Sequence, residues 1–253
     1  MTIISSEFPM KRLLWFGFPI TLALLAYGFY DAMFLAPTEV TMGNLYRIFY
    51  YHVPSATLAL VFPYVNFLAS LVYLASRRNH PDRALKADAI ALASAEITLV
   101  FGTICLATGM LWAKPTWGIW WTWDPRLTSM LMLWLIYVSY LMLRRFAAAG
   151  DLYSIGLTTT VAAVLSIFAA VDVPIVYMSI RWWRTQHPAP VFFGAPGSGV
   201  AKGMGSAIVW NLVAWGAWGI LMLTLRYQLE RRRQLQRQES ALQALEASLE
   251  VSN

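Results

Sequence analysis

The stretch Ala89–Leu111, AIALASAEITLVFGTICLATGML, decides the fold of this chain. Apart from Glu96, it carries no charged side chain. A helix that crosses the hydrocarbon core of a bilayer, about 30 Å thick, needs ~20 mostly apolar residues. Because lipid offers no hydrogen-bond partners, backbone groups at that depth must be satisfied within their own segment, which favours a helix over an open strand. The stretch therefore predicts a membrane-spanning helix.

The rest of the chain repeats this pattern. Five further apolar runs lie at residues 13–35, 54–74, 127–143, 155–178 and 207–226. Hydrophobic residues make up 58% of the chain and charged residues only 13%, about half the charged share of soluble domains. The ~10-residue alternating segments of a membrane β-barrel are absent from the sequence. We therefore expect an all-α integral membrane protein, with residues 1–227 forming a bundle of six transmembrane helices.

The distribution of Lys and Arg predicts the orientation of these helices. With the N-terminus in the cytoplasm, 13 of the 19 Lys and Arg residues lie in cytoplasmic segments, as the positive-inside rule requires. Both termini are then cytoplasmic, and the polar tail at residues 228–253 is expected to extend the sixth helix there. The connections that contain residues 36–53, 112–128 and 181–205 fall on the periplasmic face. Because the basic residues flank apolar runs, the net charge of +6 does not indicate a nucleic-acid partner.

The periplasmic connection at residues 112–128 is unusually rich in tryptophan, with five of the chain's 12 Trp residues. Pro115, Gly118 and Pro125 argue against one continuous helix through it. Tryptophan also anchors helices at any membrane interface, so a structural belt is one interpretation. The density of indoles favours a platform for a flat, apolar ligand with anionic groups, because rings stack on indoles while Lys or Arg side chains bind carboxylates. Haem has that shape.

Two of the three histidines, His52 and His187, are predicted on the same face as these tryptophans, whereas His80 is predicted on the cytoplasmic side. A neutral imidazole is a common iron ligand. One histidine from each flanking connection could approach an iron from opposite sides. Their spacing alone leaves open whether they share a ligand or are ordinary hydrogen-bonded residues.

Two acidic residues lie inside apolar runs, where an unpaired charge is costly. Glu96 is expected to pair with a Lys or Arg from another helix. Asp172 is predicted near the periplasmic end of its helix, close enough to shape the floor of the ligand platform. The single cysteine, Cys105, is expected to be a buried small apolar residue without a disulfide partner.

The motif WGIWWTWDPRLT at residues 117–128 strongly resembles the tryptophan-rich WWD signature of the haem-handling membrane proteins of cytochrome c maturation. The segments YYHVP (residues 50–54) and WWRTQH (residues 182–187), the short chain and the six spans look like the haem exporter protein C (CcmC) family. The resemblance implies that His52 and His187 are axial ligands of a transiently bound b-type haem. It also implies a haem platform that meets a haem chaperone, formed by Trp117, Trp120, Trp121, Trp123, Asp124 and Arg126.

Four further residues complete the predicted haem site: Arg47, Asp172, Trp182 and Trp183. Arg47 is expected to contact either a haem propionate or a lipid headgroup. The resemblance also implies that the protein lies in the bacterial inner membrane and passes haem to the chaperone CcmE, together with CcmA, CcmB and CcmD of an ABC-type complex. The chain has no glycine-rich phosphate-binding pattern, so ATP hydrolysis is expected in a partner and no enzyme activity in this chain. An electron-carrying b-type haem subunit and a permease for haem or another solute remain as alternatives.

Overall fold

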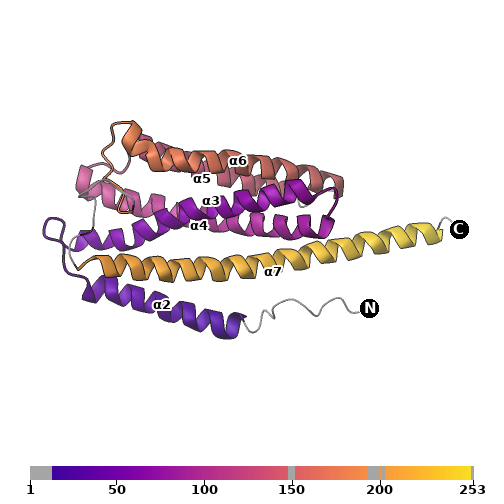
Figure 1. Cartoon of the computed structure of the whole chain (residues 1–253), viewed down its shortest axis with the longest axis horizontal. Helices are drawn as coiled ribbons and strands as arrows, with labels where there is room; N and C mark the ends of the chain where they lie inside the picture. The colour runs from indigo at the N-terminus through magenta and orange to yellow at the C-terminus, as the bar shows by residue number, and fades with distance from the viewer. Residues whose placement is uncertain (1–12, 148–151, 193–199, 201–202, 252–253) are drawn as a thin grey trace.

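The computed structural model (Figure 1) describes residues 13–147, 152–192, 200 and 203–251. Residues 1–12 of the predicted transmembrane domain, residues 252–253 of the predicted tail and part of the third predicted periplasmic connection lie outside the described residues. Six helices within the described part are long and apolar enough to cross a membrane. The prediction of an all-α, multi-pass membrane protein is therefore confirmed.

The helices follow one another along the chain with short connections. They are α2 (Phe18–Tyr30), flanked by the π-helical turns η1 (Leu13–Gly17) and η2 (Asp31–Leu35), then the 3-10 turn η3 (Asn44–Ile48), α3 (Phe49–Ser76), α4 (Pro81–Trp117), α5 (Pro125–Ala147), α6 (Leu152–Trp182) and α7 (Gly205–Val251). The tail at residues 228–251 is thus a direct continuation of α7.

Two helices extend further towards the predicted periplasmic side than the apolar runs indicated. Helix α3 begins at Phe49, so His52 lies in its first turn rather than in the preceding connection, and Pro54 lies inside the helix. Helix α4 continues through Pro115 and ends at Gly118, which has a left-handed φ of 79° and donates its N–H to the Lys114 carbonyl. Glycine takes this conformation without a Cβ clash. The helix therefore ends at the glycine and not at the proline.

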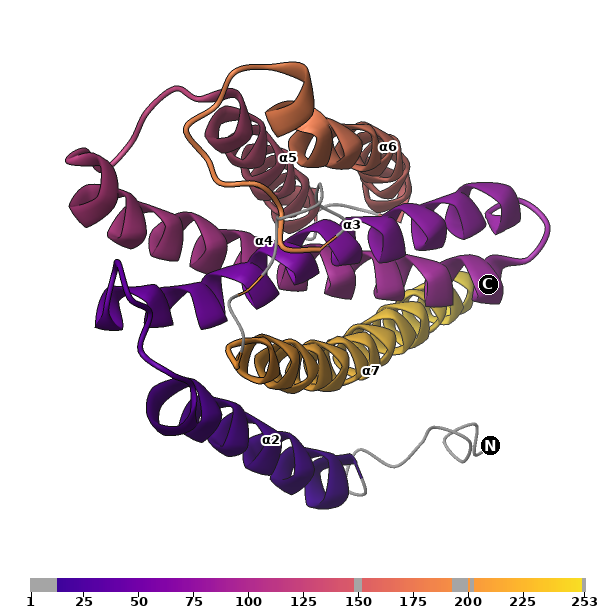
Figure 2. The ribbon, with the colours of Figure 1, turned by 60° about the vertical axis from the view of Figure 1, so that its left-hand side comes forward.

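The helices are arranged in layers (Figures 1 and 2). Helix α2 lies along α7, α7 packs against α3 and α4, and α5 and α6 cover the other side. The α2–α3, α4–α5 and α6–α7 connections gather at one end of the bundle, whereas the α3–α4 turn lies at the opposite end. We call these the connection end and the turn end. The alternation places His52 and His187 at the connection end and His80 at the turn end.

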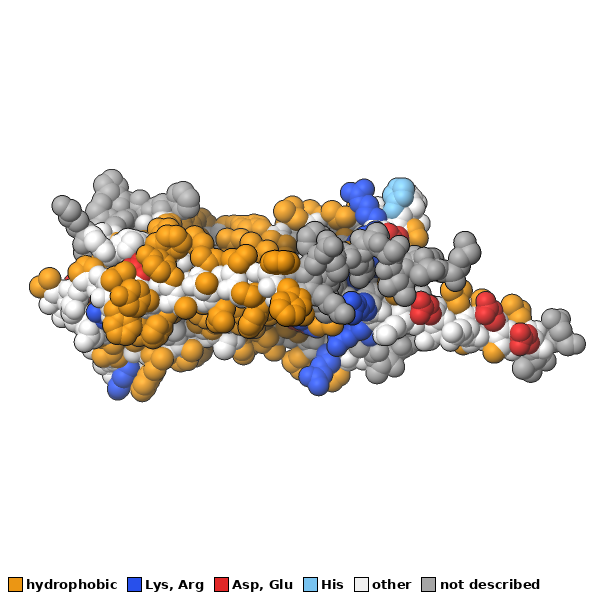
Figure 3. All heavy atoms as spheres, turned by 90° about the horizontal axis from the view of Figure 1, so that it is seen from below, with side chains coloured by type: hydrophobic (Ala, Val, Ile, Leu, Met, Phe, Trp, Pro, Cys, Tyr) orange, Lys and Arg blue, Asp and Glu red, His pale blue; other side chains and the backbone are white. Residues whose placement is uncertain are grey.

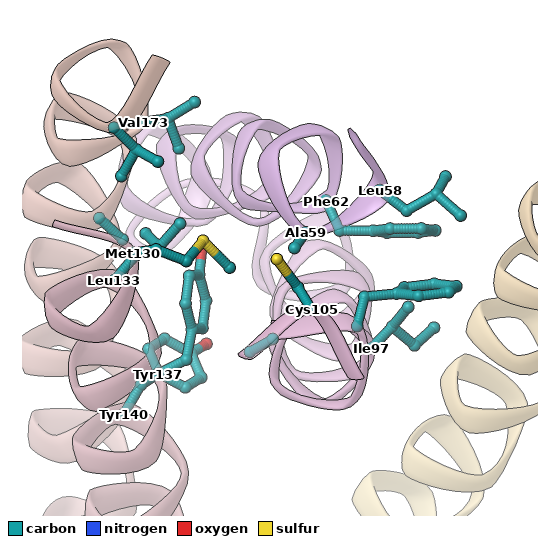
Figure 4. Packing of buried hydrophobic residues seen from close by; sticks show 14 of the residues in the cluster. Leu58, Ala59, Phe62, Ile97, Cys105, Met130, Leu133, Tyr137, Tyr140 and Val173 are labelled. Carbon is teal, nitrogen blue, oxygen red and sulfur yellow. The ribbon is translucent and has the colours of Figure 1, made fainter. Parts of the chain in front are cut away.

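The buried core lies between α3, α4, α5, α6 and α7. The rings of Phe62 and Phe101 stack with their centroids 5.9 Å apart. Met130 of α5 points towards Cys105 of α4 (Figure 4), and the hydroxyl of Tyr137 donates to Asn66 of α3 at 3.3 Å. Cys105 is buried, as predicted. In the same region the amide of Asn66 donates to the Ala91 carbonyl at 2.8 Å. These contacts hold the antiparallel pair α3 and α4 at the centre of the fold.

The outside of the bundle is apolar where lipid would cover it. Large side chains on the outer faces of the helices remain exposed, including Val61, Leu68, Phe168 and Ile220. Hydrophobic side chains cover much of the left-hand part of the face in Figure 3, and Lys and Arg side chains lie towards both ends of that zone. An exposed apolar surface of this extent is the expected exterior of a protein solvated by a bilayer.

The turn end is closed by a network of paired charges. Arg144 of α5 lies 2.7 Å from Asp88 of α4, with both side chains about nine-tenths buried. Gln234 of α7 donates to the same carboxylate at 3.2 Å. Arg226 of α7 binds Glu96 of α4, which confirms the prediction that Glu96 pairs with a cation from another helix.

Candidate functional site

A cavity of about 1070 Å³ opens at the connection end of the bundle. Its walls come from α3, the last turns of α4, the start of α5, the part of α6 near the connection end and the segment that follows His187. The lining is largely apolar, and it includes both His52 and His187. Sites for small molecules and cofactors are concave, mostly apolar and carry a few placed polar groups, and their volumes are usually ~300–1,000 Å³. This cavity is therefore large enough for a bulky planar ligand.

The two histidines face one another although they come from distant parts of the chain. Their ring centroids are 6.4 Å apart, and the ring planes meet at 39°. His52 stands on α3, and His187 lies in the connection between α6 and α7. The sequence left open whether these residues meet, and the fold brings them together.

His52 is held by the neighbouring helix α4. Its Nδ1 lies 3.0 Å from the hydroxyl oxygen of Thr108. At Gly109, an added Cβ would lie 3.3 Å from Cε1 of the imidazole, so a glycine allows the α4 backbone to approach the ring closely. The position of this imidazole is therefore set by the packing of α3 on α4.

His187 is held by contacts within its own segment. Its Nδ1 lies 2.8 Å from the carbonyl oxygen of Pro188, and its backbone N–H donates to the hydroxyl of Thr185 at 3.0 Å. Burial and the nearby charge of Arg126 lower the pKa of His187 to about 4, although the bond to Pro188 and the charge of Asp124 oppose the shift. The imidazole is therefore neutral at pH 7, which is the form that binds metals.

Asp124 ties the His187 segment to the start of α5. One carboxylate oxygen accepts the backbone N–H of Arg126 at 2.8 Å, and the other accepts the backbone N–H of Gln186 at 2.9 Å. Burial acts to raise the pKa of Asp124, but hydrogen bonds from Thr185 and these N–H groups outweigh it and hold the pKa below its ordinary value. The side chain does not line the cavity. Asp124 thus joins two connections, whereas the sequence suggested a place on the ligand platform.

Arg126 brings a cation to the cavity wall, where no other Lys or Arg stands among the described residues. Its guanidinium donates to the carbonyls of Val176 and Tyr177 in α6, at 2.6 and 3.1 Å. These bonds use one nitrogen, Nη1, and fix the direction of the group. Because an arginine has five N–H donors, several remain for an anionic ligand.

The predicted tryptophan platform divides into two groups. Trp117 and Trp121 line the cavity together with Trp112, whose ring packs edge-to-face on Trp117. Trp120 and Trp123 do not line it and are 53% and 74% exposed. A second exposed group, Trp182 and Trp183, packs edge-to-face at the end of α6, also away from the cavity wall.

Two further predicted residues do not line the cavity. The guanidinium of Arg47 donates to the Ala32 carbonyl in η2 and, through Nε, to the Asn44 side chain at 3.2 Å. The Asp172 carboxylate lies on α6, and its Oδ2 is buried without a hydrogen-bond partner among the described residues. Neither the Arg47 guanidinium nor the Asp172 carboxylate is therefore placed to contact a ligand in the cavity.

Thr108 and Gly109 are site residues that the sequence pattern did not indicate. They lie inside an apolar run, and nothing in their local pattern points to a histidine. The short α3–α4 turn carried a usable signal, because it makes the two helices antiparallel. In such a pair, residues at similar distances before and after the turn lie side by side. The part of α4 that is expected to lie beside His52 in this way includes Thr108.

The sequence matches the family model described as "CcmC: Heme exporter protein C" over residues 6–243. The chain belongs to the heme exporter protein C family. It is 36% identical over 228 residues to the "Heme exporter protein C" of Bradyrhizobium diazoefficiens, covering 90% of this chain and 81% of that protein. With the protein of the same name from Escherichia coli K12 it shares 31% identity over 215 residues, 85% of this chain and 80% of the relative.

A further relative is named as a mitochondrial protein. The chain is 33% identical over 164 residues to a "ccmC-like mitochondrial protein" of Marchantia polymorpha, whose name refers to cytochrome c biosynthesis. The match covers 65% of this chain and 64% of that protein.

Proposed function

We propose that this protein binds haem in the cavity at the connection end, with His52 and His187 as the two axial ligands. The spacing of the two imidazoles is the observation that carries the proposal. A metal about 2 Å from one nitrogen of each of two facing imidazoles separates the ring centres by about 6 Å. The observed separation of 6.4 Å fits one metal between them. The names of the relatives, which refer to heme export, support the same ligand.

The lining of the cavity suits the rest of a haem molecule. The apolar walls and the indoles of Trp117 and Trp121 provide contact surface for the porphyrin. The Arg126 guanidinium, fixed by the α6 carbonyls, offers the free donors that a propionate would accept. The chain's contribution is to hold and orient the haem rather than to break bonds in it, so we propose a haem-binding and transfer subunit that is not an enzyme.

In this proposal the connection end lies at the periplasmic surface of the inner membrane, because the Lys and Arg distribution favours cytoplasmic termini. The protein then delivers haem to the chaperone CcmE during cytochrome c maturation, as part of an ABC-type complex with CcmA, CcmB and CcmD. The exposed Trp120 and Trp123 lie in the same connection as the cavity-lining Trp121, which makes them candidates for the surface that meets the chaperone. Exposed aromatic side chains are common anchors at protein interfaces.

The test is the haem content of the purified protein in detergent. The variants His52→Ala and His187→Ala should each lose most of the haem absorbance that the unsubstituted protein retains. His80→Ala, at the turn end, is the matched control and should keep it. Normal haem content in both His52→Ala and His187→Ala would remove the ligand assignment.

Delivery is tested separately with haem-loaded protein and purified CcmE. Trp120→Ala should keep its haem, because this indole does not line the cavity, yet transfer less of it. A wild-type rate of transfer in Trp120→Ala and in Trp123→Ala would count against the docking surface. Haem that is reduced and reoxidised but never transferred would favour the electron-carrier alternative.

A further inference from the structure

We propose that Thr108 is a positioning residue that fixes the tautomer of His52, keeping the proton on Nδ1 and the lone pair on Nε2 available to a metal. This inference rests on the proposed function, because it concerns how an axial ligand is prepared. Thr108 belongs to α4 and does not itself reach the metal. It acts through the His52 ring.

The direction of the Thr108 hydroxyl follows from its neighbours. Its oxygen lies 2.6 Å from the Ile104 carbonyl and 3.2 Å from the Cys105 carbonyl. A hydroxyl has a single proton to donate, and a backbone carbonyl only accepts. The proton of Thr108 is therefore directed to the backbone of its own helix. Towards any third group the oxygen acts as an acceptor.

That third group is Nδ1 of His52, 3.0 Å away. Because the hydroxyl only accepts here, Nδ1 must carry the proton. A neutral imidazole has one protonated nitrogen, so Nε2 keeps its lone pair. The Cys105 carbonyl, which the Thr108 hydroxyl also contacts, is a second acceptor for the His52 ring. With the proton on Nδ1, the nitrogen that a metal requires is unprotonated before any ligand arrives.

His187 reaches the same state by a different route. Its Nδ1 lies 2.8 Å from the Pro188 carbonyl, which also only accepts, so the proton again resides on Nδ1. Metal-binding histidines commonly donate their second ring N–H to such an acceptor, which fixes the tautomer and makes the ligand more basic. The acceptor for His187 is backbone and no side-chain substitution removes it. One acceptor for His52 is the Thr108 side chain, beside the Cys105 carbonyl, so the role of Thr108 is open to direct test.

The experiment compares Thr108→Val with Thr108→Ser in the purified, haem-loaded protein. Valine has nearly the shape of threonine but accepts no hydrogen bond, whereas serine keeps the hydroxyl. Thr103→Val is the matched control, because Thr103 makes the same bond to its own helix at Leu99 but accepts from the Trp134 indole rather than from a histidine. The readouts are haem affinity, the midpoint potential of the bound haem and its ferric electron paramagnetic resonance spectrum.

We expect Thr108→Val to bind haem about tenfold or more weakly, as is typical when the hydrogen-bond partner of a metal ligand is removed. Its midpoint potential should rise, because a less basic imidazole stabilises ferric iron less. Thr108→Ser should restore both values, and Thr103→Val should match the unsubstituted protein. If Thr108→Val yields too little folded protein, Thr108→Ala removes the same acceptor with a smaller side chain.

Unchanged affinity and potential in Thr108→Val or Thr108→Ala would overturn the inference. An equal change in Thr103→Val would overturn it too, since the effect would then be general to α4. The proposed function fails separately, if His52→Ala and His187→Ala both keep normal haem content. Loss of haem in His52→Ala together with unchanged properties in Thr108→Val would reject only the role of Thr108.

Discussion

The two ends of the helix bundle differ in whether their polar groups are paired with one another. At the turn end, Arg144 and Asp88 pair in a buried position, and Gln234 of α7 fills a remaining acceptor site of that carboxylate. At the connection end, the His52 and His187 rings are each held by one nitrogen, and a cavity lies between the surrounding helices. Buried polar groups stabilise a fold only when they are satisfied. A ligand site, in contrast, needs donors and lone pairs that the protein leaves free.

This contrast indicates that the turn end stabilises the fold and the connection end binds the ligand. Helix α7 reaches the turn end with Arg226, Arg231 and Gln234, which bind side chains of α4. These contacts fix α4, and α4 in turn carries Thr108 to the connection end. We therefore expect substitutions at the turn end to change stability more than ligand binding, and substitutions at the connection end to do the reverse.

The largest effect on stability is expected from Arg144→Met. It leaves Asp88 buried without its cationic partner, and breaking a buried pair in this way costs about 3–5 kcal/mol. The free energy of unfolding in detergent measures the loss, and haem affinity of the folded fraction should stay unchanged. Lys86→Met is the control, because its ion pair with Asp82 is exposed and such pairs contribute about 0–1 kcal/mol. If Arg144→Met lowers the free energy of unfolding no more than Lys86→Met does, the stabilising role of the turn end would be refuted.

A smaller loss of stability, with a clear loss of haem affinity, is expected from Asp124→Ala. The substitution leaves the N–H groups of Arg126 and Gln186 without their acceptor, at a cost of about 1–3 kcal/mol. The segment that bears His187 would then be released from α5. Calorimetry and haem titration measure the two effects. Asp124→Asn keeps one acceptor oxygen and should fall between Asp124→Ala and the unsubstituted protein; full haem affinity in Asp124→Ala would show that the link is dispensable.

A third expected effect is a dependence of stability on pH at the connection end. The pKa of His187 is lowered to about 4 in the folded, haem-free protein, against about 6.5 in an unfolded chain. As pH falls from 6.5 towards 4, His187 binds a proton in the unfolded chain but not in the folded protein. Its contribution to the free energy of unfolding therefore declines across that window and is constant above it. Nitrogen-15 resonances of the imidazole measure the protonation directly. A titration midpoint near 6.5 for His187 would contradict the prediction.

The sequence was most informative where one physical rule acts on a continuous segment. The need to satisfy backbone groups in lipid makes each long apolar run a helix, so six spans follow from composition and length alone. Their alternation then places His52 and His187 at one end and His80 at the other. The cost of an unpaired charge in an apolar helix predicted a cationic partner for Glu96, and the structure supplies Arg226.

The same rules do not predict contacts between segments that are distant in the chain. The sequence grouped Asp124 with the tryptophans beside it, but its carboxylate bonds the segment before His187. Trp120 and Trp121 are neighbours in the chain, yet only Trp121 lines the cavity. These differences arise because the surroundings of each side chain depend on segments that are distant in the chain, as the bond between Asp124 and Gln186 illustrates.

By itself, the sequence determined a membrane protein of six helices with an aromatic, histidine-bearing end, because apolar length and backbone hydrogen bonding act locally. The tertiary structure decided that the two imidazoles lie 6.4 Å apart, that Asp124 joins two connections and that Thr108 meets His52. Each of these is a contact between residues far apart in the chain. Such contacts depend on the packing of whole helices, which no local pattern specifies.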